Sequence, residues 1–269
     1  MSIQFGMIGG GVMGEALLSR LLAQEIYSSD QVLVSEPQVQ RQAYLVQQYG
    51  IAVTSDNQQV IDAVPVLLLA IKPQVFEQVF GQTSSLSSSS SEQLVLSILA
   101  GVPLARLQAA FPNQPVIRSM PNTPATVGAG ITAIAAGQQV TGEQVQLAQQ
   151  IFGAVGAVVE VPEGLMDAVT GLSGSGPGYV AVMIEALIDG GVAVGLPRAV
   201  ATQLAIQTVR GTADLLQAKN LHPAQLKDQV TSPGGTTIAG IAQLEQAGIR
   251  SALIEAVKAA CQRSQELGR

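Results

Sequence analysis

Two different patterns of apolar and polar positions divide the chain near Pro162. Up to that residue, short and almost continuously apolar runs alternate with segments in which apolar residues recur at helical spacing. Runs that are apolar on both faces are typical of parallel strands covered by helices on each side. The expected strands are Ile3–Ile8, Val32–Ser35, Ile51–Val53, Val66–Ala70, Leu94–Ile98, Val116–Met120, Gly130–Ala135 and Val155–Val161.

The segments between these strands carry helix signals. The expected helices are Met13–Gln24, Gln38–Tyr49, Gln58–Ala63 and Pro103–Ala110. Asp56 is placed to cap the third of them, and Thr141 with Gln144 three residues later predicts a capping box for a further helix. Alternation of strands and helices predicts an α/β fold, namely a doubly wound Rossmann-type sheet, in a first domain of residues 1–162.

After Pro162 the strand pattern stops and only helical segments follow. The expected helices are Glu163–Leu172, Gly176–Val194, Pro197–Ala218, Pro223–Val230, Gly234–Ala247 and Ile249–Glu266. The second of these is apolar nearly all round, which indicates a buried helix. We therefore predict an all-helical C-terminal domain, residues 163–269, that pairs with a second copy of the chain.

Composition supports self-association and excludes several functions. Hydrophobic residues make up 47% of the chain and charged residues 12%, a balance that favours a large subunit interface. The net charge of −6 argues against nucleic acid as a partner. A single histidine, His222, excludes a His-rich metal site and most Ser-His-Asp arrangements, so no metal is expected, and the lone Cys261 indicates a reducing cytoplasm.

No segment is expected to enter a membrane. The N-terminus runs straight into a strand without a signal peptide, and the apolar stretch Gly178–Leu196 contains two carboxylates, Glu185 and Asp189. The serine-rich tract Ser84–Ser91 is typical of a flexible surface loop.

A glycine-rich turn follows the first strand and matches G-x-G-x-x-G. Its residues are Gly9, Gly10, Gly11, Val12, Met13 and Gly14. The first glycine of the motif permits a tight turn, the second lets the backbone approach a pyrophosphate, and the third lets the helix pack on the strand. At the first strand–helix junction of an alternating pattern, this turn predicts a site for a nicotinamide dinucleotide, NADPH or NADH.

The choice between the two cofactors is open at this stage. Glu36, at the end of the second strand, is placed to accept a hydrogen bond from a ribose 2′-hydroxyl and so favours NADH, whereas Ser35 and Arg41 would favour a 2′-phosphate. Glu36 also fits a solvated turn residue. Lys72, at the end of the fourth strand, is expected to lie in the cofactor crevice.

The C-terminal half carries more specific motifs. The segment Leu226–Gly240, which contains Ser232-Pro233-Gly234-Gly235-Thr236-Thr237, closely resembles the signature of pyrroline-5-carboxylate reductases. Leu172–Tyr179 resembles a second element of that family, although Gly178 stands where alanine is usual. Ala70–Gln74 and Arg118–Pro124 also resemble family elements, and the four occur in the family's order along nearly the whole chain.

The resemblance implies a reductase that transfers a hydride from NADPH or NADH to a cyclic imine and so forms proline, in a homodimer or a larger assembly such as a decamer. It implies a catalytic role near the imine nitrogen for Thr237, and cofactor contacts for one further set of residues. That set is Asn57, Ala70, Ile71, Lys72, Pro73, Ile98, Leu99 and Ala100.

The residues of the signature fit that chemistry. Ser232, Gly234, Gly235, Thr236 and Thr237 form a turn that opens a helix, and the free N–H groups of its first turn suit a carboxylate. The threonine hydroxyls can exchange hydrogen bonds with a ring nitrogen. A small ring with one carboxylate and one C=N bond is therefore the expected substrate, and catalysis would consist mostly of positioning.

Two residues of this region have competing interpretations. Asn220 stands where some relatives carry glutamate near the substrate amine, which puts a substrate contact in doubt. His222 is expected to cap a helix rather than donate a proton.

Two rival functions compete with this interpretation. β-Hydroxyacid dehydrogenases use an essential lysine in the second domain, but Lys219, Lys227 and Lys258 lie outside that family's glycine-rich lysine motif. A dinucleotide sensor with an inactive reductase fold would need no carboxylate-binding turn.

Overall fold

The computed structural model describes residues 2–81 and 91–268, which form two compact units. One unit comprises Met1–Ser175 with Ala259–Arg269, and the other comprises Gly176–Lys258. All of the expected serine loop except Ser91 lies outside the described residues. The units do not coincide with the expected domains 1–162 and 163–269, because the segment that follows residue 162 and the last turns of the chain pack with the sheet. The functional domain boundary at residue 162 stays a prediction.

The first unit, the sheet unit, is built on one eight-stranded sheet with the order β3-β2-β1-β4-β5-β6-β7-β8. The strands are β1 Phe5–Ile8, β2 Val32–Ser35, β3 Ala52–Thr54, β4 Val66–Leu69, β5 Leu94–Ser97, β6 Val116–Met120, β7 Gly130–Ala136 and β8 Gly156–Glu160. All neighbouring strands are parallel except β6 and β7. The predicted doubly wound sheet and all eight predicted strands are confirmed. The chain reverses direction across the sheet between β1 and β4, where such folds bind their ligands.

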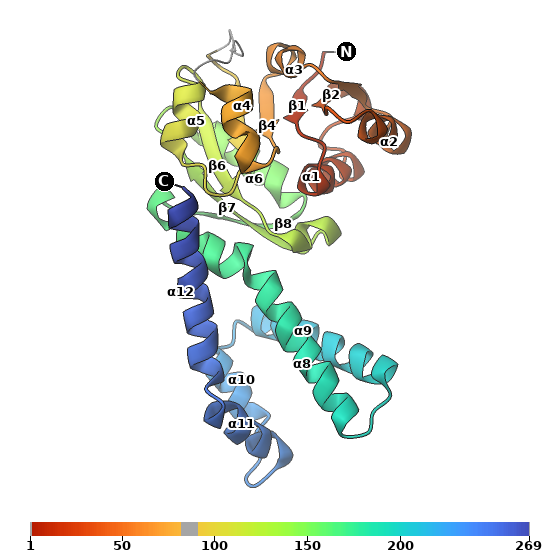
Figure 1. Cartoon of the computed structure of the whole chain (residues 1–269), viewed down its shortest axis with the longest axis vertical. Helices are drawn as coiled ribbons and strands as arrows, with labels where there is room; N and C mark the ends of the chain where they lie inside the picture. Colours follow the sequence, from red (N-terminus) through yellow and green to blue (C-terminus); the bar gives the residue numbers. More distant parts are fainter. Residues whose placement is uncertain (1, 82–90, 269) are drawn as a thin grey trace. The chain divides into compact units, whose positions relative to one another are not determined.

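Each face of the sheet has its own apolar core and its own helices (Figure 1). One core joins the sheet to α1 Val12–Ala23, α2 Val39–Tyr49 and α6 Gly142–Gly153. The other joins it to α3 Asn57–Ala63, α4 Phe76–Phe80, α5 Leu104–Ala110 and α7 Met166–Val169. Burial on both faces explains why β4 is apolar at every position, and why β2 and β5 are apolar up to their last residues, Ser35 and Ser97.

The predicted helix caps are present. The carboxylate of Asp56 accepts hydrogen bonds from the backbone N–H groups of Gln58 (2.9 Å) and Gln59 (3.4 Å). Thr141 and Gln144 form the reciprocal capping box of α6. The pattern did not predict α4, which is short and follows a 3₁₀ turn at Pro73–Val75.

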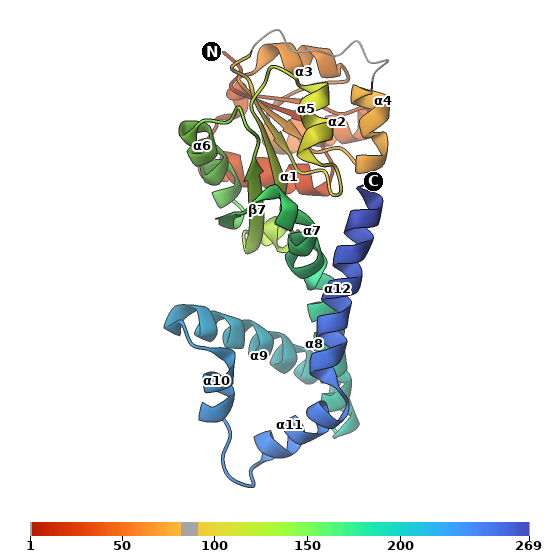
Figure 2. The same cartoon turned by 90° about the vertical axis from the view of Figure 1, so that its left-hand side faces the viewer.

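The second unit, the helical unit, contains α8 Gly176–Ala193, α9 Arg198–Lys219, α10 Pro223–Gln229 and α11 Thr236–Gln246, with the first turns of α12 Ile249–Leu267. Figure 2 shows α9, α10 and α11 following one another as an open chain of helices. The closest packing is between α8 and α9, where a Cβ on Gly191 would lie 3.1 Å from that of Ala201. The Tyr179 hydroxyl donates to the carbonyl of Ala256 at 3.3 Å.

The expectation that α8 is a buried helix is wrong for the single chain. None of its residues is buried, and Val182 and Leu187 are 66% and 54% exposed. An apolar helix can be recognised from the sequence, but whether its covering comes from the same chain or from another copy is not encoded in its own pattern. None of the helices in the described ranges meets the length and apolarity that crossing a membrane requires.

Candidate active site

The glycine-rich turn joins β1 to α1, and the three glycines of its motif meet different surroundings. Gly9 has φ +101°, and a Cβ there would lie 2.7 Å from the carbonyl oxygen of Ala70. A Cβ on Gly14 would lie 2.7 Å from the carbonyl oxygen of Gly9 and 3.0 Å from the sulfur of Met7. At Gly11 nothing lies within 4 Å. The turn therefore needs Gly9 for its conformation and Gly14 for close packing, while Gly11 borders open space that a pyrophosphate can fill.

The carboxyl ends of β1, β2, β4 and β5 lie at one edge of the sheet and carry the predicted cofactor residues. The N–H of Gly9 donates to the carbonyl of Ser35 at 2.8 Å, and that of Ala70 to the carbonyl of Ile8 at 2.8 Å. The N–H of Ile98 donates to the carbonyl of Leu69 at 3.1 Å. The structure thus places the glycine-rich turn, Ser35, Ala70 and Ile98 along this carboxyl-terminal edge of the sheet, which we call the cofactor crest.

Glu36 is not a solvated turn residue. It is 7% exposed, and its carboxylate accepts hydrogen bonds from the N–H of Gly10 and the N–H of Gln38, both at 3.0 Å. The amide of Gln42 donates to its backbone carbonyl at 2.5 Å. These contacts hold the carboxylate against the glycine-rich turn, where the cofactor ribose is expected.

Ser35 and Asn57 contact each other. The Ser35 hydroxyl donates to Oδ1 of Asn57 at 2.6 Å, and Ser35 is 1% exposed. This bond joins the end of β2 to the first residue of α3 and fixes the predicted Asn57 beside the second strand.

Arg41 belongs to a polar cluster that the sequence did not reveal. Its Nε donates to the carbonyl of Gly10 at 2.7 Å, and its guanidinium forms an ion pair with Glu15. The hydroxyls of Tyr44 (2.9 Å) and Tyr49 (2.7 Å) donate to the same Glu15 carboxylate, and Arg41 lies over the Tyr44 ring. The four residues are spread over two helices, so no short motif marks them.

The charges of this cluster shift its pKa values. Burial tends to raise the pKa of Glu15, but the hydrogen bonds from Arg41, Tyr49 and Tyr44 outweigh it and hold that pKa below the usual 4.5. Burial, followed by the hydrogen bond to Glu15, raises the pKa of Tyr49. Glu15 is therefore the ionised acceptor and the tyrosines are the donors over the working range of an enzyme.

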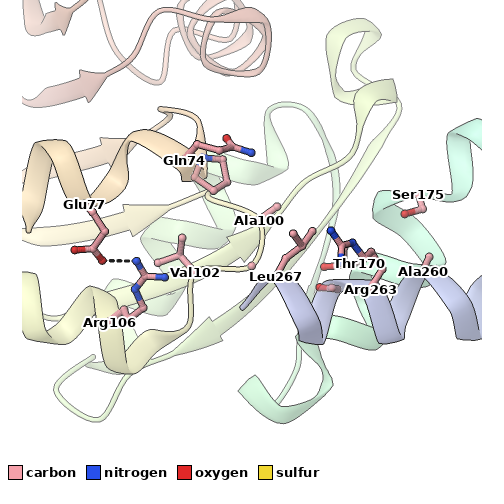
Figure 3. Close-up of a pocket in the computed structure, with 13 residues that line it drawn as sticks. Gln74, Glu77, Ala100, Val102, Arg106, Thr170, Ser175, Ala260, Arg263 and Leu267 are labelled. Carbon is pink, nitrogen blue, oxygen red and sulfur yellow. Dashed lines mark hydrogen bonds and ion pairs between the residues drawn. The ribbon is translucent and has the colours of Figure 1, made fainter. Parts of the chain in front are cut away.

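The loops after β4 and β5 border a cavity of about 620 Å³ within the sheet unit. Pro73, Ala100 and Val102 line it on the strand side, and the last turns of α12 line it opposite. Figure 3 shows the Glu77–Arg106 ion pair at one end and Thr170 and Arg263 at the other. Of the predicted loop residues, Pro73 and Ala100 line the cavity, Leu99 is buried beneath the loop, and Lys72 is exposed.

Several lining residues were missed by the sequence reasoning. Arg263 and Leu267 reach the cavity from α12, at the far end of the chain. No local signal could have found them, because only the tertiary packing of α12 brings them there. Ser175 lies within a quoted family element, so a signal existed for it.

The second predicted group, Ser232 to Thr237, lies on the helical unit. Gly234 has φ +65°, and the N–H of Gly235 donates to the carbonyl of Ser232 at 3.1 Å, so the segment turns directly into α11. The N–H of Ala239 donates to the carbonyl of Gly235 at 3.3 Å, and no side chain caps α11 within the described chain. The first N–H groups of an uncapped helix are suited to an anion.

The two threonines of this turn differ in exposure. Thr236 is exposed and Thr237 is half-buried, and both lie in the first turn of α11. Neither hydroxyl has a hydrogen-bond partner among the residues that the structure describes. The geometry therefore allows a bound group to contact either of them.

Two residues ahead of this turn have structural roles. Asn220 ends α9 in the left-handed conformation (φ 47°, ψ 42°), which asparagine tolerates better than most residues. Nδ1 of His222 accepts from the N–H of Ala224 at 3.2 Å and caps α10. The predicted capping role of His222 is confirmed. No group of three or more His, Cys, Asp or Glu side chains within residues 2–81 and 91–268 could hold a metal ion.

The sheet, its glycine-rich turn and the crest at its switch point define a dinucleotide-binding oxidoreductase of the Rossmann class. A family model described as "NADP oxidoreductase coenzyme F420-dependent" matches residues 4–101. A second one, described as "Pyrroline-5-carboxylate reductase dimerisation", matches residues 163–267.

Relatives cover the whole chain. A pyrroline-5-carboxylate reductase from Synechocystis sp. is 60% identical over 100% of both chains, and one from Methanosarcina acetivorans is 44% identical over 99% of this chain and 98% of its own. The solved structure of a pyrroline-5-carboxylate reductase from Coxiella burnetii has a TM-score of 0.92 at 32% identity over 100% of both chains. That from Plasmodium falciparum, solved with NADP bound, has a TM-score of 0.88 at 29% identity, covering 99% of this chain and 98% of its own. The chain belongs to the pyrroline-5-carboxylate reductase family.

Proposed function

We propose that this protein reduces 1-pyrroline-5-carboxylate to L-proline with NADH or NADPH, the last step of proline biosynthesis. The observation that carries the proposal is the presence in one chain of two complementary sites. One is a glycine-rich turn open at Gly11, and the other is the uncapped, glycine-led start of α11. The first suits a dinucleotide and the second suits a small carboxylate.

The sheet unit binds and orients the cofactor. Gly9–Gly14 and the N-terminus of α1 hold the pyrophosphate, and the positive charge of Lys72 lies at the same crest. Ile71, Pro73, Leu99 and Ala100 shape the loops that receive the nicotinamide. The bound cofactor supplies the hydride that adds to the carbon of the C=N bond.

The helical unit binds the substrate. Ser232, Gly234, Gly235 and Thr236 hold the carboxylate through backbone N–H groups and hydroxyls, and the Thr237 hydroxyl contacts the imine nitrogen. A protonated imine is already strongly electrophilic, so the residues need only place its carbon against the nicotinamide and exclude competing orientations. Thr237 keeps its hydrogen bond to the nitrogen as the charged imine becomes an amine.

The protein acts as an assembly of identical subunits, a dimer or a larger oligomer such as a decamer. The match to a dimerisation family over residues 163–267 and the uncovered apolar face of α8 support this part of the proposal. We place the enzyme in the cytoplasm, where the lone Cys261 would stay reduced.

The test is a turnover assay with purified full-length protein. The decrease of reduced nicotinamide is followed with the cyclic imine present, and proline is identified as the product. Cofactor binding without imine-dependent oxidation would contradict the proposal and favour a dinucleotide sensor. Oxidised cofactor reduced in the presence of a β-hydroxyacid, but not consumed with the imine, would favour the dehydrogenase alternative.

A further inference from the structure

The adenosine end of the cofactor crest has an uneven distribution of charge. The loops after β2 and β3 carry two carboxylates, Glu36 and Asp56, and the one cation close by in sequence is Arg41. In this fold the ribose 2′ position lies at the end of β2, so these groups decide whether a hydroxyl or a phosphate is accepted there.

Glu36 is fixed in the orientation that meets a ribose. Its Oε2 accepts from the N–H of Gly10 and its Oε1 from the N–H of Gln38, both at 3.0 Å, and the residue is 7% exposed. Each carboxylate oxygen has a further lone pair that can accept from a hydroxyl. A carboxylate held by two backbone donors cannot turn away from an incoming phosphate without breaking those bonds.

Arg41 is engaged elsewhere. Its guanidinium contacts both the carbonyl of Gly10 and the carboxylate of Glu15, and two tyrosine hydroxyls also donate hydrogen bonds to that carboxylate. Binding a 2′-phosphate through Arg41 would require it to leave an ion pair that is already satisfied. The charge of Arg41 is therefore largely neutralised by Glu15.

Two further polar groups near the end of β2, Ser35 and Asp56, are also engaged. The Ser35 hydroxyl donates to Asn57, and the side chain of Asp56 caps α3. The phosphate-binding alternative that Ser35 and Arg41 offer in the sequence is thus removed by their contacts in the fold.

We infer that Glu36 is the residue that determines cofactor specificity, and that it makes this chain bind NADH more tightly than NADPH. The inference rests on the proposed function, because it assumes that the glycine-rich turn binds a nicotinamide dinucleotide. A ribose 2′-hydroxyl can donate to the carboxylate, whereas a 2′-phosphate meets a like charge in a buried setting where salt screens it poorly.

The experiment measures the affinity of the full-length protein for NADH and NADPH separately, without substrate. The reduced nicotinamide is itself fluorescent, so the change in its emission on binding reports the affinity directly. Calorimetry with 5′-AMP and with 2′,5′-ADP isolates the adenosine end. We expect wild type to bind NADH and 5′-AMP at least about tenfold more tightly than their phosphorylated counterparts, the factor that one lost charged contact typically produces.

Variants assign the effect to the carboxylate. Glu36→Gln should reduce the NADH-over-NADPH ratio at least about tenfold, and Glu36→Asp, which keeps the charge, should retain a preference for NADH. Asp62→Asn is the matched control, since it removes one negative charge from an exposed position on α3 of the same unit and should leave the ratio unchanged. If Glu36→Gln does not fold, the wild-type ratio of the two affinities and its response to salt still test the inference. NADPH binding that weakens with added salt far more than NADH binding would indicate that cations hold the 2′-phosphate, against the inference.

The outcomes separate this inference from the proposed function. Equal or tighter binding of NADPH by wild type overturns the assignment of Glu36 but leaves a working dinucleotide site. An unchanged ratio in a folded Glu36→Gln variant overturns it as well. If wild type binds neither cofactor, the proposed function itself fails.

Discussion

The two compact units differ in how far they bury their own apolar residues. In the sheet unit, β1, β2, β4 and β5 are buried at every position, and each face of the sheet has its own core. In the helical unit only Ala201, Ala205 and Leu226 are buried among Gly176–Lys258. The sheet unit can therefore be stabilised by its own residues, whereas the helical unit needs apolar surface from outside the chain.

This difference has a functional consequence. The glycine-rich turn, Glu36 and Arg41 are held by hydrogen bonds within one packed unit, so their geometry is preorganised. The start of α11 lies on the unit that lacks a core of its own. We expect cofactor binding to be a property of the single chain, and substrate binding and turnover to depend on assembly.

The largest effect is expected from charging α8. Val182→Glu places a carboxylate on an apolar position that is 66% exposed in the single chain. If another copy covers this face, the charge is buried without a partner and the assembly should dissociate, with loss of nearly all turnover. Light scattering should give the mass of a monomer, 27.7 kDa, while NADH binding persists.

Val46→Glu on α2 is the matched control, because Val46 is 48% exposed on the sheet unit. It should assemble and turn over like wild type. A Val182→Glu protein with the native mass and native activity would show that α8 is not at the interface.

A smaller effect is expected at Thr237. Thr237→Ala should leave folding and cofactor affinity intact and lower kcat/KM by about one to three powers of ten, the usual loss for a hydrogen bond to a reacting group. A purely structural contact in the first turn of α11 would instead cost about 0.5–2 kcal/mol of stability without changing the kinetics.

Two neighbouring variants make this distinction sharper. Thr237→Ser keeps the hydroxyl and should retain much of the activity, and Thr236→Ala should be milder because Thr236 is the more exposed residue. Wild-type kinetics with a lowered melting temperature in Thr237→Ala would mark the residue as structural.

Much of the sheet unit could be predicted from the sequence because its signals are local. A strand buried on both faces is apolar throughout, as in Val66–Leu69, and the caps at Asp56 and Thr141 lie within three residues of the N–H groups that they bind. The glycine-rich turn is equally local, since a Cβ on Gly14 would meet the carbonyl oxygen of Gly9, five residues earlier, at 2.7 Å.

What could not be predicted depends on contacts between distant elements. Arg41 was a candidate phosphate ligand until the fold placed it against Glu15, 26 positions away. Arg263 lines the cavity beside the loops after β4 and β5 only because α12 returns to the sheet unit. The exposure of α8 was missed for a related reason, because apolar periodicity reports that a face needs covering but not which chain covers it.

The next effect in size, within the sheet unit, is expected from adding one methyl group at the glycine-rich turn. Gly14→Ala would place its Cβ 2.7 Å from the Gly9 carbonyl oxygen, so the helix must move away from the strand, at a cost of about 1–3 kcal/mol in the free energy of unfolding. The methyl group of Gly11→Ala meets nothing within 4 Å, so this variant should fold with a loss of at most about 1 kcal/mol in the free energy of unfolding, at the start of the helix. It should nevertheless weaken cofactor binding about tenfold or more, because the methyl group occupies the space of the pyrophosphate.

Urea unfolding and cofactor titration, carried out on both variants, separate the two roles. Equal loss of stability in Gly11→Ala and Gly14→Ala would show that the space beside Gly11 is not open in the folded protein. Unchanged cofactor affinity in Gly11→Ala would show that the pyrophosphate does not approach this turn.

The smallest effect is a pH dependence within the same self-contained unit. The folded pKa of Glu15 lies below its usual 4.5, because the hydrogen bonds from Arg41, Tyr49 and Tyr44 outweigh the opposing effect of burial. A carboxyl whose pKa is lowered by folding contributes stability above its unfolded pKa and loses it as the pH falls through the folded one. Glu15→Gln should therefore cost about 1 kcal/mol or less at pH 7, as expected for a partly exposed ion pair, and the difference from wild type should shrink as the pH falls below 4.5.

The free energy of unfolding should be measured at one fixed protein concentration, since assembly also contributes to it. Arg41→Met removes the other charge of the pair and should reduce the same pH-dependent part, leaving the share that the hydrogen bonds from Tyr49 and Tyr44 contribute. A difference that stays constant from pH 7 down through the acid range would show that the charge of Glu15 does not stabilise the fold.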